Sequence, residues 1–229
     1  MISQVIKVLI VVTSHSQLGN TGKPTGYYLP EVTHPYQKLQ ELGFGVDIAS
    51  PKGGKAPMDE KSRDLKDPIN RKLLESKEFV AKLENTIALK DVRAKDYQAI
   101  VFAGGHGTMW DFSNSTEINN LSQNIYESGG VVAAVCHGPA ALVNIKLSDG
   151  KYLVAGKSLT GFSNAEEAAA ELTKVMPFLL EDELKKRGAK YFAKPLWQGH
   201  VITDGRLVTG QNPASAAGVG EAVAKLLKR

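Results

Sequence analysis

The chain has little cysteine and no long apolar run near its start, and each shortage excludes a class of protein. Its 229 residues include a single cysteine, Cys136, so an intrachain disulfide is impossible and a disulfide-stapled scaffold is excluded. The apolar run over residues 7–12 is far too short to cross a membrane, and no small-residue cleavage site flanks it. We therefore expect a soluble, cytoplasmic protein without a membrane partner.

The chain also has only a small excess of positive over negative charge. Lys and Arg number 28 and Asp and Glu 24, which leaves a net charge of +4 spread along the chain. This excess is too small to form an electrostatic surface for a phosphate backbone, so no nucleic-acid partner is expected. With 42% hydrophobic, 23% charged and 7% aromatic residues, the composition is that of a globular protein rather than a disordered or fibrous one.

The short motifs that bind metals and nucleotides are absent from the sequence. It contains no Cys-x2-Cys, no His-x3-His and no Gly-x4-Gly-Lys-Ser loop. His15, His34 and His200 show no ligand-like spacing to acidic residues or to the lone cysteine. The sequence therefore predicts neither a metal site nor a cofactor.

Short β-branched runs alternate with amphipathic stretches, a pattern typical of a parallel sheet covered by helices. The fold class predicted is α/β: a doubly wound, mostly parallel sheet flanked by helices, flavodoxin-like, in one domain over residues 1–229. An inserted, cap-like segment is expected around residues 51–95, and its first part, residues 51–67, is rich in Lys, Gly, Pro and Asp. Strands are predicted over 7–13, 45–50, 98–103 and 130–135, a hairpin or short strands over 153–160, and a hairpin over 201–209. Helices are predicted over 31–42, 70–83, 116–128, 165–174, 177–187 and 213–228.

The strongest local signal surrounds the cysteine. A buried strand over 130–135 ends at Cys136, and Gly138 and Pro139 begin a helix two residues later. A strand-to-helix elbow with small neighbours presents its central side chain at the carboxyl edge of the sheet, where open α/β folds place their sites. A helix N-terminus behind the sulfur favours the thiolate. Cys136 is therefore the predicted nucleophile, although a lone cysteine is more often a small buried apolar residue.

Residues 134–140 (Ala-Val-Cys-His-Gly-Pro-Ala) resemble the elbow of the ThiJ/PfpI superfamily, whose fold is similar to that of class I glutamine amidotransferases. The heat-shock chaperone and glyoxalase III branch is the most similar part of it. Five further segments match in the right order, at residues 25–31, 47–54, 103–107, 159–164 and 208–215. Each is weak alone, but together they extend over most of the chain.

The resemblance implies a role for each of several residues. Glu31 occupies the place of a glutamate beside the nucleophile, where burial and like charge raise the pKa of a carboxyl group. Glu167 matches the carboxylate that orients His137 in a Cys-His-Glu triad, and the adjacent Glu166 is the alternative. Plain structural roles remain open for these acids, as a first-turn acid of a helix and as a solvated helix residue.

A glycine loop over residues 104–107 follows the third predicted strand, and its spacing does not match a dinucleotide fingerprint. Glycine at these positions lets the backbone approach a ligand closely, although a simple tight turn would explain the same glycines. The resemblance implies an oxyanion hole formed by the N–H groups of Gly105 and His137. His106 either lines the site or caps the loop.

The activity that the resemblance implies is that of a cofactor-free glyoxalase III, a lyase acting on a small 2-oxoaldehyde. Methylglyoxal and water would give lactate without glutathione, and removal of glycation adducts from proteins would use the same chemistry. Alternatives are a cysteine peptidase or amidase, a holdase stress chaperone with an exposed apolar patch, and a redox sensor. The resemblance also implies a homodimer.

Overall fold

A seven-stranded sheet forms the centre of the computed structural model, which describes residues 5–228. The strand order is β3-β2-β1-β4-β5-β9-β8, and every neighbouring pair is parallel except β8 and β9. The strands are β1 (Lys7–Val11), β2 (Gly45–Ser50), β3 (Ile87–Ala88), β4 (Ala99–Phe102), β5 (Val131–Val135), β8 (Val201–Asp204) and β9 (Leu207–Gly210). The predicted α/β class with a mostly parallel sheet is confirmed.

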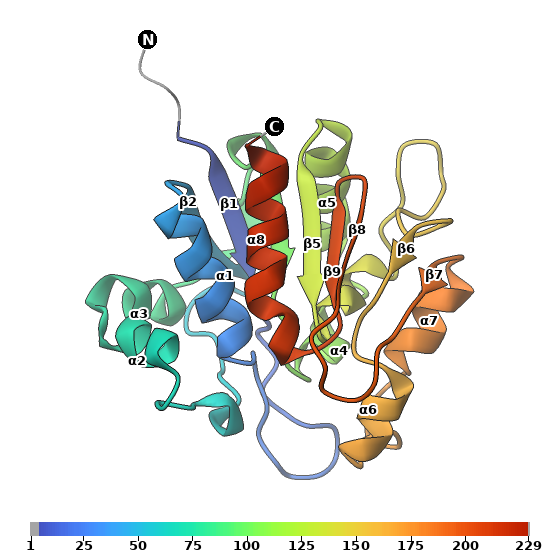
Figure 1. The fold of residues 1–229 in the computed structure, drawn as a ribbon, viewed down its shortest axis with the longest axis horizontal. Helices are drawn as coiled ribbons and strands as arrows, with labels where there is room; N and C mark the ends of the chain where they lie inside the picture. The colour runs from blue at the N-terminus through green and yellow to red at the C-terminus, as the bar shows by residue number, and fades with distance from the viewer. Residues whose placement is uncertain (1–4, 229) are drawn as a thin grey trace.

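Helices cover both faces of this sheet (Figure 1). The α-helices are α1 (Pro30–Glu41), α2 (Pro68–Glu75), α3 (Lys77–Glu84), α4 (Thr108–Asp111), α5 (Thr116–Glu127), α6 (Asn164–Ala169), α7 (Leu180–Lys186) and α8 (Ala216–Leu227). The 3-10 helices are η1 (Glu60–Ser62), η2 (Leu89–Asp91), η3 (Ala94–Asp96), η4 (Gly138–Leu142) and η5 (Pro213–Ser215). In Figure 1, α1 and α8 lie side by side in front of the sheet and α5 lies behind it. No helix among those described is long and apolar enough to span a membrane.

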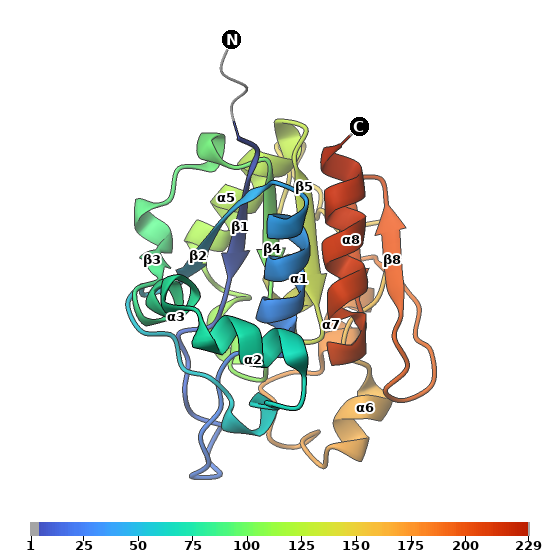
Figure 2. The same ribbon diagram turned by 60° about the vertical axis from the view of Figure 1, so that its left-hand side comes forward.

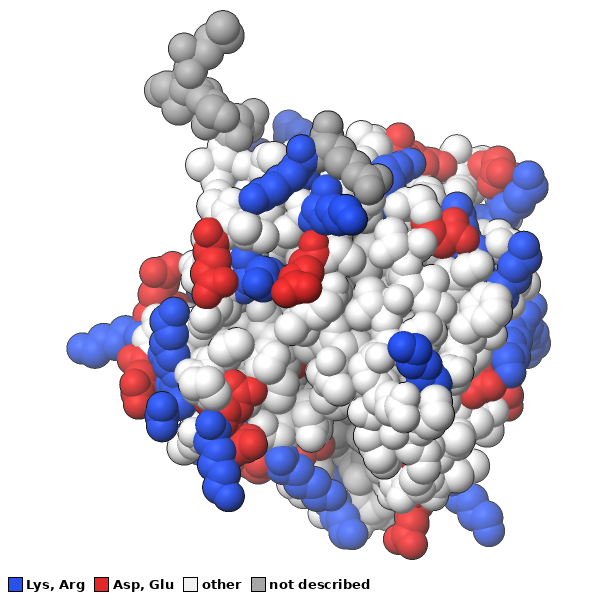
Figure 3. All heavy atoms as spheres, in the orientation of Figure 1, with Lys and Arg blue, Asp and Glu red and all other residues white. Residues whose placement is uncertain are grey.

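The central strands are buried because helices cover both of their faces. Every residue of β4 and β5 is buried, which explains why these segments are continuously apolar in the sequence. Figure 2 shows β1 and β5 pointing the same way, so their carboxyl ends meet at one edge of the sheet, on the side of α2 and α6. Positively and negatively charged side chains are mixed round the edge of the face shown in Figure 3, and much of its centre is uncharged.

Three predicted elements differ from the structure. The helix expected over 70–83 is two helices, because Ser76 has an extended backbone and its hydroxyl caps α3 by accepting a hydrogen bond from the Phe79 N–H at 3.3 Å. Of the hairpin or short strands expected over 153–160, one short strand forms and no hairpin does. This strand, β6 (Ser158–Leu159), pairs in parallel with β7 (Lys190–Tyr191), and each paired residue lies 32 positions further along the chain. The helix expected over 165–174 ends as α6 at Ala169.

The segment over 51–95 contains η1, α2, α3, β3, η2 and part of η3. Most of it lies outside the sheet, beside α1 (Figure 2). Its strand β3 pairs with the end of β2 and was not predicted, since two residues carry no periodicity. The hairpin predicted over 201–209 is confirmed as β8 and β9, and β9 also pairs with β5.

Candidate active site

The chain makes a sharp turn at the carboxyl end of β5. Cys136 has φ +61°, a left-handed conformation that few residues other than glycine adopt, and its N–H donates to the Gly210 carbonyl at 2.9 Å. A Cβ atom at Gly138 would collide with the Phe102 carbonyl oxygen, so the elbow requires glycine there. The predicted strained elbow is confirmed, although the helix that follows is the five-residue 3-10 helix η4.

A buried carboxyl group lies beside the thiol. Glu31, in the first turn of α1, is fully buried, and its Oε2 accepts a hydrogen bond of 2.7 Å from the Gly104 N–H at the end of β4. Burial raises the pKa of Glu31 to about 8, although hydrogen bonding with Cys136 and with the Gly104 N–H opposes the rise. Glu31 therefore carries a proton at neutral pH, as expected for a carboxyl group next to the nucleophile.

An imidazole and a second carboxyl group lie on the other side of the thiol. Nδ1 of His137 is 3.4 Å from the Cys136 sulfur, and Nε2 of His137 is 2.7 Å from Oε2 of Glu167. The remaining oxygen of Glu167, Oε1, is 3.0 Å from Nε2 of His106. The structure thus brings four predicted site residues, Cys136, His137, Glu167 and His106, into one connected group with Glu31 beside it.

The protonation of these groups follows from burial and from charge. Burial alone would raise the pKa of Glu167, but the neighbouring charge of His137 and the hydrogen bonds from both histidines lower it to about 2. Burial and the nearby His106 lower the pKa of His137, so the imidazole is neutral at neutral pH and can accept a proton.

The thiolate expected from a helix N-terminus is not supported. Burial, followed by the charge of Glu31 and a hydrogen bond to it, raises the pKa of Cys136 well above its usual range. The short 3-10 helix and the single N–H of His137 that favours the anion do not outweigh this desolvation. Cys136 is therefore a neutral thiol until a base accepts its proton.

The two adjacent glutamates of α6 point in different directions. Oε1 of Glu166 accepts hydrogen bonds from the Trp197 N–H at 3.1 Å and from Asn212 Nδ2 at 2.9 Å. Its Oε2 accepts from the N–H and the hydroxyl of Ser163, each at 3.0 Å. Glu166 thus joins α6 to two other loops, and Glu167 is the carboxyl group that contacts the imidazole.

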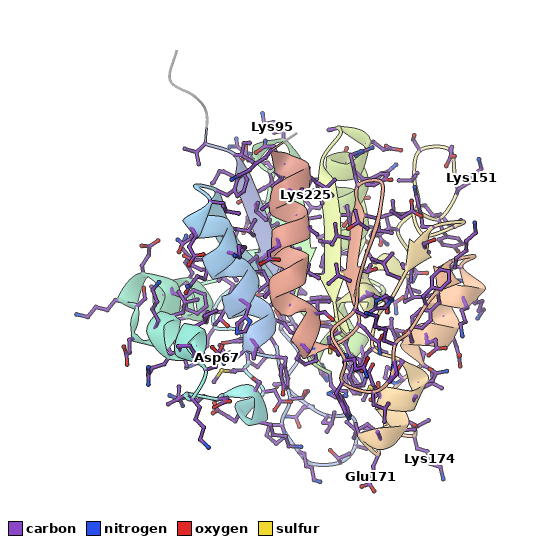
Figure 4. All side chains as sticks on the ribbon, viewed as in Figure 1. Asp67, Lys95, Lys151, Glu171, Lys174 and Lys225 are labelled. Carbon is purple, nitrogen blue, oxygen red and sulfur yellow. The ribbon has the colours of Figure 1, made fainter. Side chains whose placement is uncertain are left out.

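Further along, beyond the end of α6, the side chains of Glu171 and Lys174 point outward into solvent (Figure 4). The inward direction of Glu167 is therefore not shared by the charged residues that follow it.

The thiol opens into a cavity of about 280 Å³. Its walls are mainly apolar, with acidic and basic side chains from η1 and the residue before it. The lining residues are Leu18, Pro24, Tyr28, Asp59, Lys61, Gly105, His106, Cys136, His137, Phe162, Ala170, Leu172, Trp197 and Pro213. A larger cavity of about 610 Å³ beside α3 contains neither Cys136 nor His137, so the chemistry of the site does not extend to it.

The glycine loop after β4 faces the same cavity. Gly105 has φ +106°, and a Cβ atom there would collide with the Gly26 carbonyl oxygen, so only glycine fits. No oxygen within residues 5–228 accepts a hydrogen bond from the Gly105 N–H. That donor is therefore free to bind an oxygen atom of a ligand.

Sequence reasoning missed part of the site. Trp197, which lines the cavity with φ +64° and lies half exposed, belongs to none of the recognised segments. Tyr28 and Phe162 lie inside recognised segments, but no argument from the residues marked them as cavity walls. For His106 the sequence left two roles open, lining the site or capping the loop, and in the structure its Nε2 contacts the Glu167 carboxyl group.

The site also includes a set of side chains that could hold a metal ion. Ligand atoms of His106, His137 and Glu167 all lie within 4.8 Å of one another. His15, His34 and His200 are not members of this group.

Comparison with known proteins identifies a family profile that matches this chain and relatives that are similar to it. The sequence profile of the DJ-1/PfpI family matches residues 25–226. The glutathione-independent glyoxalase HSP31 of Saccharomyces cerevisiae is 38% identical over 222 residues, 92% of this chain and 93% of the relative.

Two solved structures resemble this one closely. The Rapid Encystment Protein 24 KDa of Francisella tularensis superposes with a TM-score of 0.94 and 43% identity, over 97% of this chain and 99% of that chain. Glyoxalase III from Candida albicans superposes with a TM-score of 0.91 and 31% identity, over 97% of this chain and 98% of that chain.

Proposed function

Because the chain belongs to the DJ-1/PfpI family, we propose that it is a glutathione-independent glyoxalase that converts methylglyoxal and water to lactate without a cofactor. The names of the yeast and Candida relatives support this assignment. The observation that carries it is a pair of buried carboxyl groups whose pKa values are pushed apart, to about 8 for Glu31 and about 2 for Glu167. In such a pair, Glu31 keeps a proton that it can donate, whereas Glu167 stays negatively charged.

In the proposed mechanism, a Cys-His-Glu triad of Cys136, His137 and Glu167 forms the covalent intermediate. The sulfur attacks the aldehyde carbon while its proton passes to Nδ1 of His137, which is 3.4 Å away. The Glu167 carboxylate, 2.7 Å from Nε2, stabilises the imidazolium that forms. The developing oxyanion accepts hydrogen bonds from the N–H groups of Gly105 and His137 and then takes the proton back from His137, which leaves a hemithioacetal.

The next step moves hydrogen between the two substrate carbons. Neutral His137 removes the proton from the former aldehyde carbon, and protonated Glu31 donates its proton to the ketone oxygen, which gives an enediol. His137 then protonates the second carbon while Glu31 recovers a proton from the hydroxyl on the first. The product is a 2-hydroxyacyl thioester on Cys136, formed with no net oxidation and with both acid–base groups restored.

Hydrolysis completes the cycle. His137 accepts a proton from water as the water attacks the thioester, and returns it to the departing sulfur, which releases lactate. An acyl hydrolase would need only the triad for this last step. The additional protonated carboxyl group beside the thiol is what favours the glyoxalase reaction over a peptidase or amidase.

The test is turnover of methylglyoxal by reduced, metal-free protein without glutathione, with lactate quantified. Cys136→Ser and Glu167→Gln are compared with His34→Gln, a control in which the affected histidine contacts Asp67 outside the cavity. Lactate formation by the native protein and by His34→Gln, lost in the other two variants, is the expected result. Lactate formation by Cys136→Ser would refute the nucleophile, and folded native protein without turnover would refute the reaction.

One observation favours a second function, that of a holdase chaperone. Phe192, Leu196 and Trp197 are 51%, 42% and 50% exposed and lie within six residues of one another. Exposed apolar side chains gathered along one segment are a feature of surfaces that bind other proteins, and a holdase would use them for unfolded chains. Suppression of the aggregation of a thermally unfolded enzyme should then survive Cys136→Ser and be lost on Phe192→Ser with Trp197→Ser; the reverse pattern would refute this second function.

The family membership also leads us to propose a homodimer in the cytoplasm, where Cys136 would stay reduced. Light scattering behind a size-exclusion column should give twice the 24.7 kDa chain mass. A mass equal to one chain would refute the dimer.

A further inference from the structure

Three metal-ligating side chains that are far apart in the sequence meet beside the thiol. His106, His137 and Glu167 come from the loop after β4, the elbow after β5 and helix α6. Their ring nitrogen and carboxyl oxygen atoms lie within 4.8 Å of one another, and this is the one such group of His, Cys, Asp or Glu side chains within residues 5–228. No sequence motif for a metal joins them, because each is supplied by a different element.

We propose that His106, His137 and Glu167 form a binding site for a divalent transition-metal ion of the Zn²⁺ type, and that the bound ion reversibly blocks the reaction of Cys136. The metal site itself stands on the geometry of these three side chains. Its inhibitory effect rests on the proposed glyoxalase function.

The distances between the ligand atoms fit one ion after a small adjustment. In zinc sites the nitrogen and oxygen ligands lie about 2.0–2.2 Å from the ion, so two ligands of one tetrahedral ion are separated by roughly 3.4 Å. The two histidine–carboxyl distances here are 3.0 Å to Oε1 and 2.7 Å to Oε2 of Glu167, and one ligand atom from each of the three residues lies within 4.8 Å of the others. Each histidine–carboxyl pair needs to open by less than about 1 Å, and the most distant ligand atoms need to approach by at most about 1.4 Å, for one ion to replace the hydrogen-bonding protons.

The surroundings hold the ligands in place and leave one position open. His137 and Glu167 are almost fully buried, and the His137 ring packs 4.2 Å from the ring of Phe162. His106 is 18% exposed and, with His137, lines the 280 Å³ cavity through which an ion or a water ligand would enter. Two histidines and one glutamate with an open fourth position is a ligand set typical of zinc.

The type of ligand atom selects the kind of ion. Mg²⁺ and Ca²⁺ prefer oxygen ligands, whereas imidazole nitrogen suits Zn²⁺, Co²⁺, Ni²⁺ and Cu²⁺. The Cys136 sulfur is not expected to be a ligand, because it faces Nδ1 of His137 while Glu167 faces the opposite nitrogen, Nε2. Binding should therefore not depend on the thiol.

The bound ion inhibits because it occupies one nitrogen of the His137 ring and thereby changes the protonation of the other, which faces the thiol. An ion on Nε2 leaves neutral His137 with its proton on Nδ1, so Nδ1 faces the sulfur as a donor and has no lone pair to accept the thiol proton. The ion also displaces the contact between His137 and Glu167 that stabilises the imidazolium. Both effects stop the first proton transfer of the proposed mechanism.

The site is tested by titrating metal-free protein with Co²⁺, whose visible absorption reports tetrahedral coordination, and then with Zn²⁺ in competition with a coloured chelator. We expect one ion per chain, unchanged affinity in Cys136→Ser and in His34→Gln, and affinity more than about 100-fold weaker in His106→Gln and Glu167→Gln, since changes to residues behind the ligands alone cost about 10- to 100-fold. His34 is a matched control, because its ring contacts the Asp67 carboxyl group at 2.6 Å outside the cavity. Affinity unchanged in His106→Gln with a native circular dichroism spectrum, or lost in Cys136→Ser, would overturn the site.

The regulatory effect has its own measurement. Zn²⁺ should inhibit methylglyoxal turnover in the native protein and in His34→Gln with a midpoint equal to the dissociation constant from the chelator experiment, and a chelator should restore activity. Specific binding without inhibition would overturn the regulatory effect alone. Metal-free protein without any turnover would refute the proposed function, while the Co²⁺ titration would still decide the metal site.

Discussion

Truncating Glu166 to alanine should destabilise the protein far more than truncating another glutamate nearby. Glu166 is fully buried, and its two oxygens accept four hydrogen bonds, two from Ser163, one from the Trp197 N–H and one from Asn212. Glu166 and Ser163 also form the capping box of α6. Alanine at position 166 would leave these donors without an acceptor.

The expected loss in the free energy of unfolding depends on which hydrogen-bond donors to Glu166 stay buried. The two donors of Ser163 and the amide of Asn212 lie in residues at most 4% exposed, so water cannot easily replace the lost oxygens. Trp197 is half exposed, and its N–H can be hydrated. Three buried bonds at about 1–1.5 kcal/mol each, with the lost helix cap included, give a loss of about 3–5 kcal/mol in the free energy of unfolding.

The assay is urea unfolding followed by far-UV circular dichroism at neutral pH. Glu171→Ala is the matched control, since Glu171 is exposed and points outward just beyond the end of α6 (Figure 4), and should change stability by less than about 0.5 kcal/mol. A loss below about 1 kcal/mol in Glu166→Ala would show that its hydrogen bonds do not hold α6, the Trp197 loop and the Asn212 loop together.

Three further predictions concern Glu31 and Gly105. Glu31→Gln should lower methylglyoxal turnover by about 100-fold or more with an unchanged circular dichroism spectrum, because an amide cannot exchange the proton; near-native turnover would contradict the acid–base role. Folded Glu31 keeps its proton to about pH 8, whereas an unperturbed glutamate loses it near 4.5, so its contribution to stability is fully present below pH 4.5 and is lost as pH rises to about 8. The thermal midpoint of the native protein should therefore fall relative to Glu31→Gln across that range, and parallel profiles would contradict the shift. Gly105→Ala should lower the thermal midpoint and turnover together, because φ +106° and the Gly26 carbonyl leave no room for Cβ, and left-handed strain alone costs about 1–3 kcal/mol; an unchanged midpoint would contradict this reading.

The sheet and the elbow could be predicted because their signals are local. Continuous apolar runs mark β1, β2, β4 and β5, since strands buried on both faces need apolar residues at every position. Gly138 marks the turn after Cys136, since a Cβ atom there would collide with the Phe102 carbonyl oxygen. The break of the helix at Ser76 and the two-residue strand β3 escaped prediction, because a cap competes with apolar periodicity and a strand of two residues has none.

The candidate site could be predicted only as a set of residues. Cys136 and Gly105 could be selected because each follows a recognisable strand, and Glu31 because it lies in the first segment that resembles the family. Only the tertiary structure decides which glutamate of α6 contacts His137, since neighbouring residues on a helix point about 100° apart and both are acidic.

The charge on the thiol also depends on tertiary structure. The local sequence places a helix N-terminus behind Cys136, which favours the anion, but the fold buries the sulfur beside Glu31, which raises its pKa. The meeting of His106 with His137 and Glu167 has the same origin, because long-range packing of separate strand ends creates it. Burial and contact between distant segments are properties of the folded chain, and these decided what the sequence motifs left open.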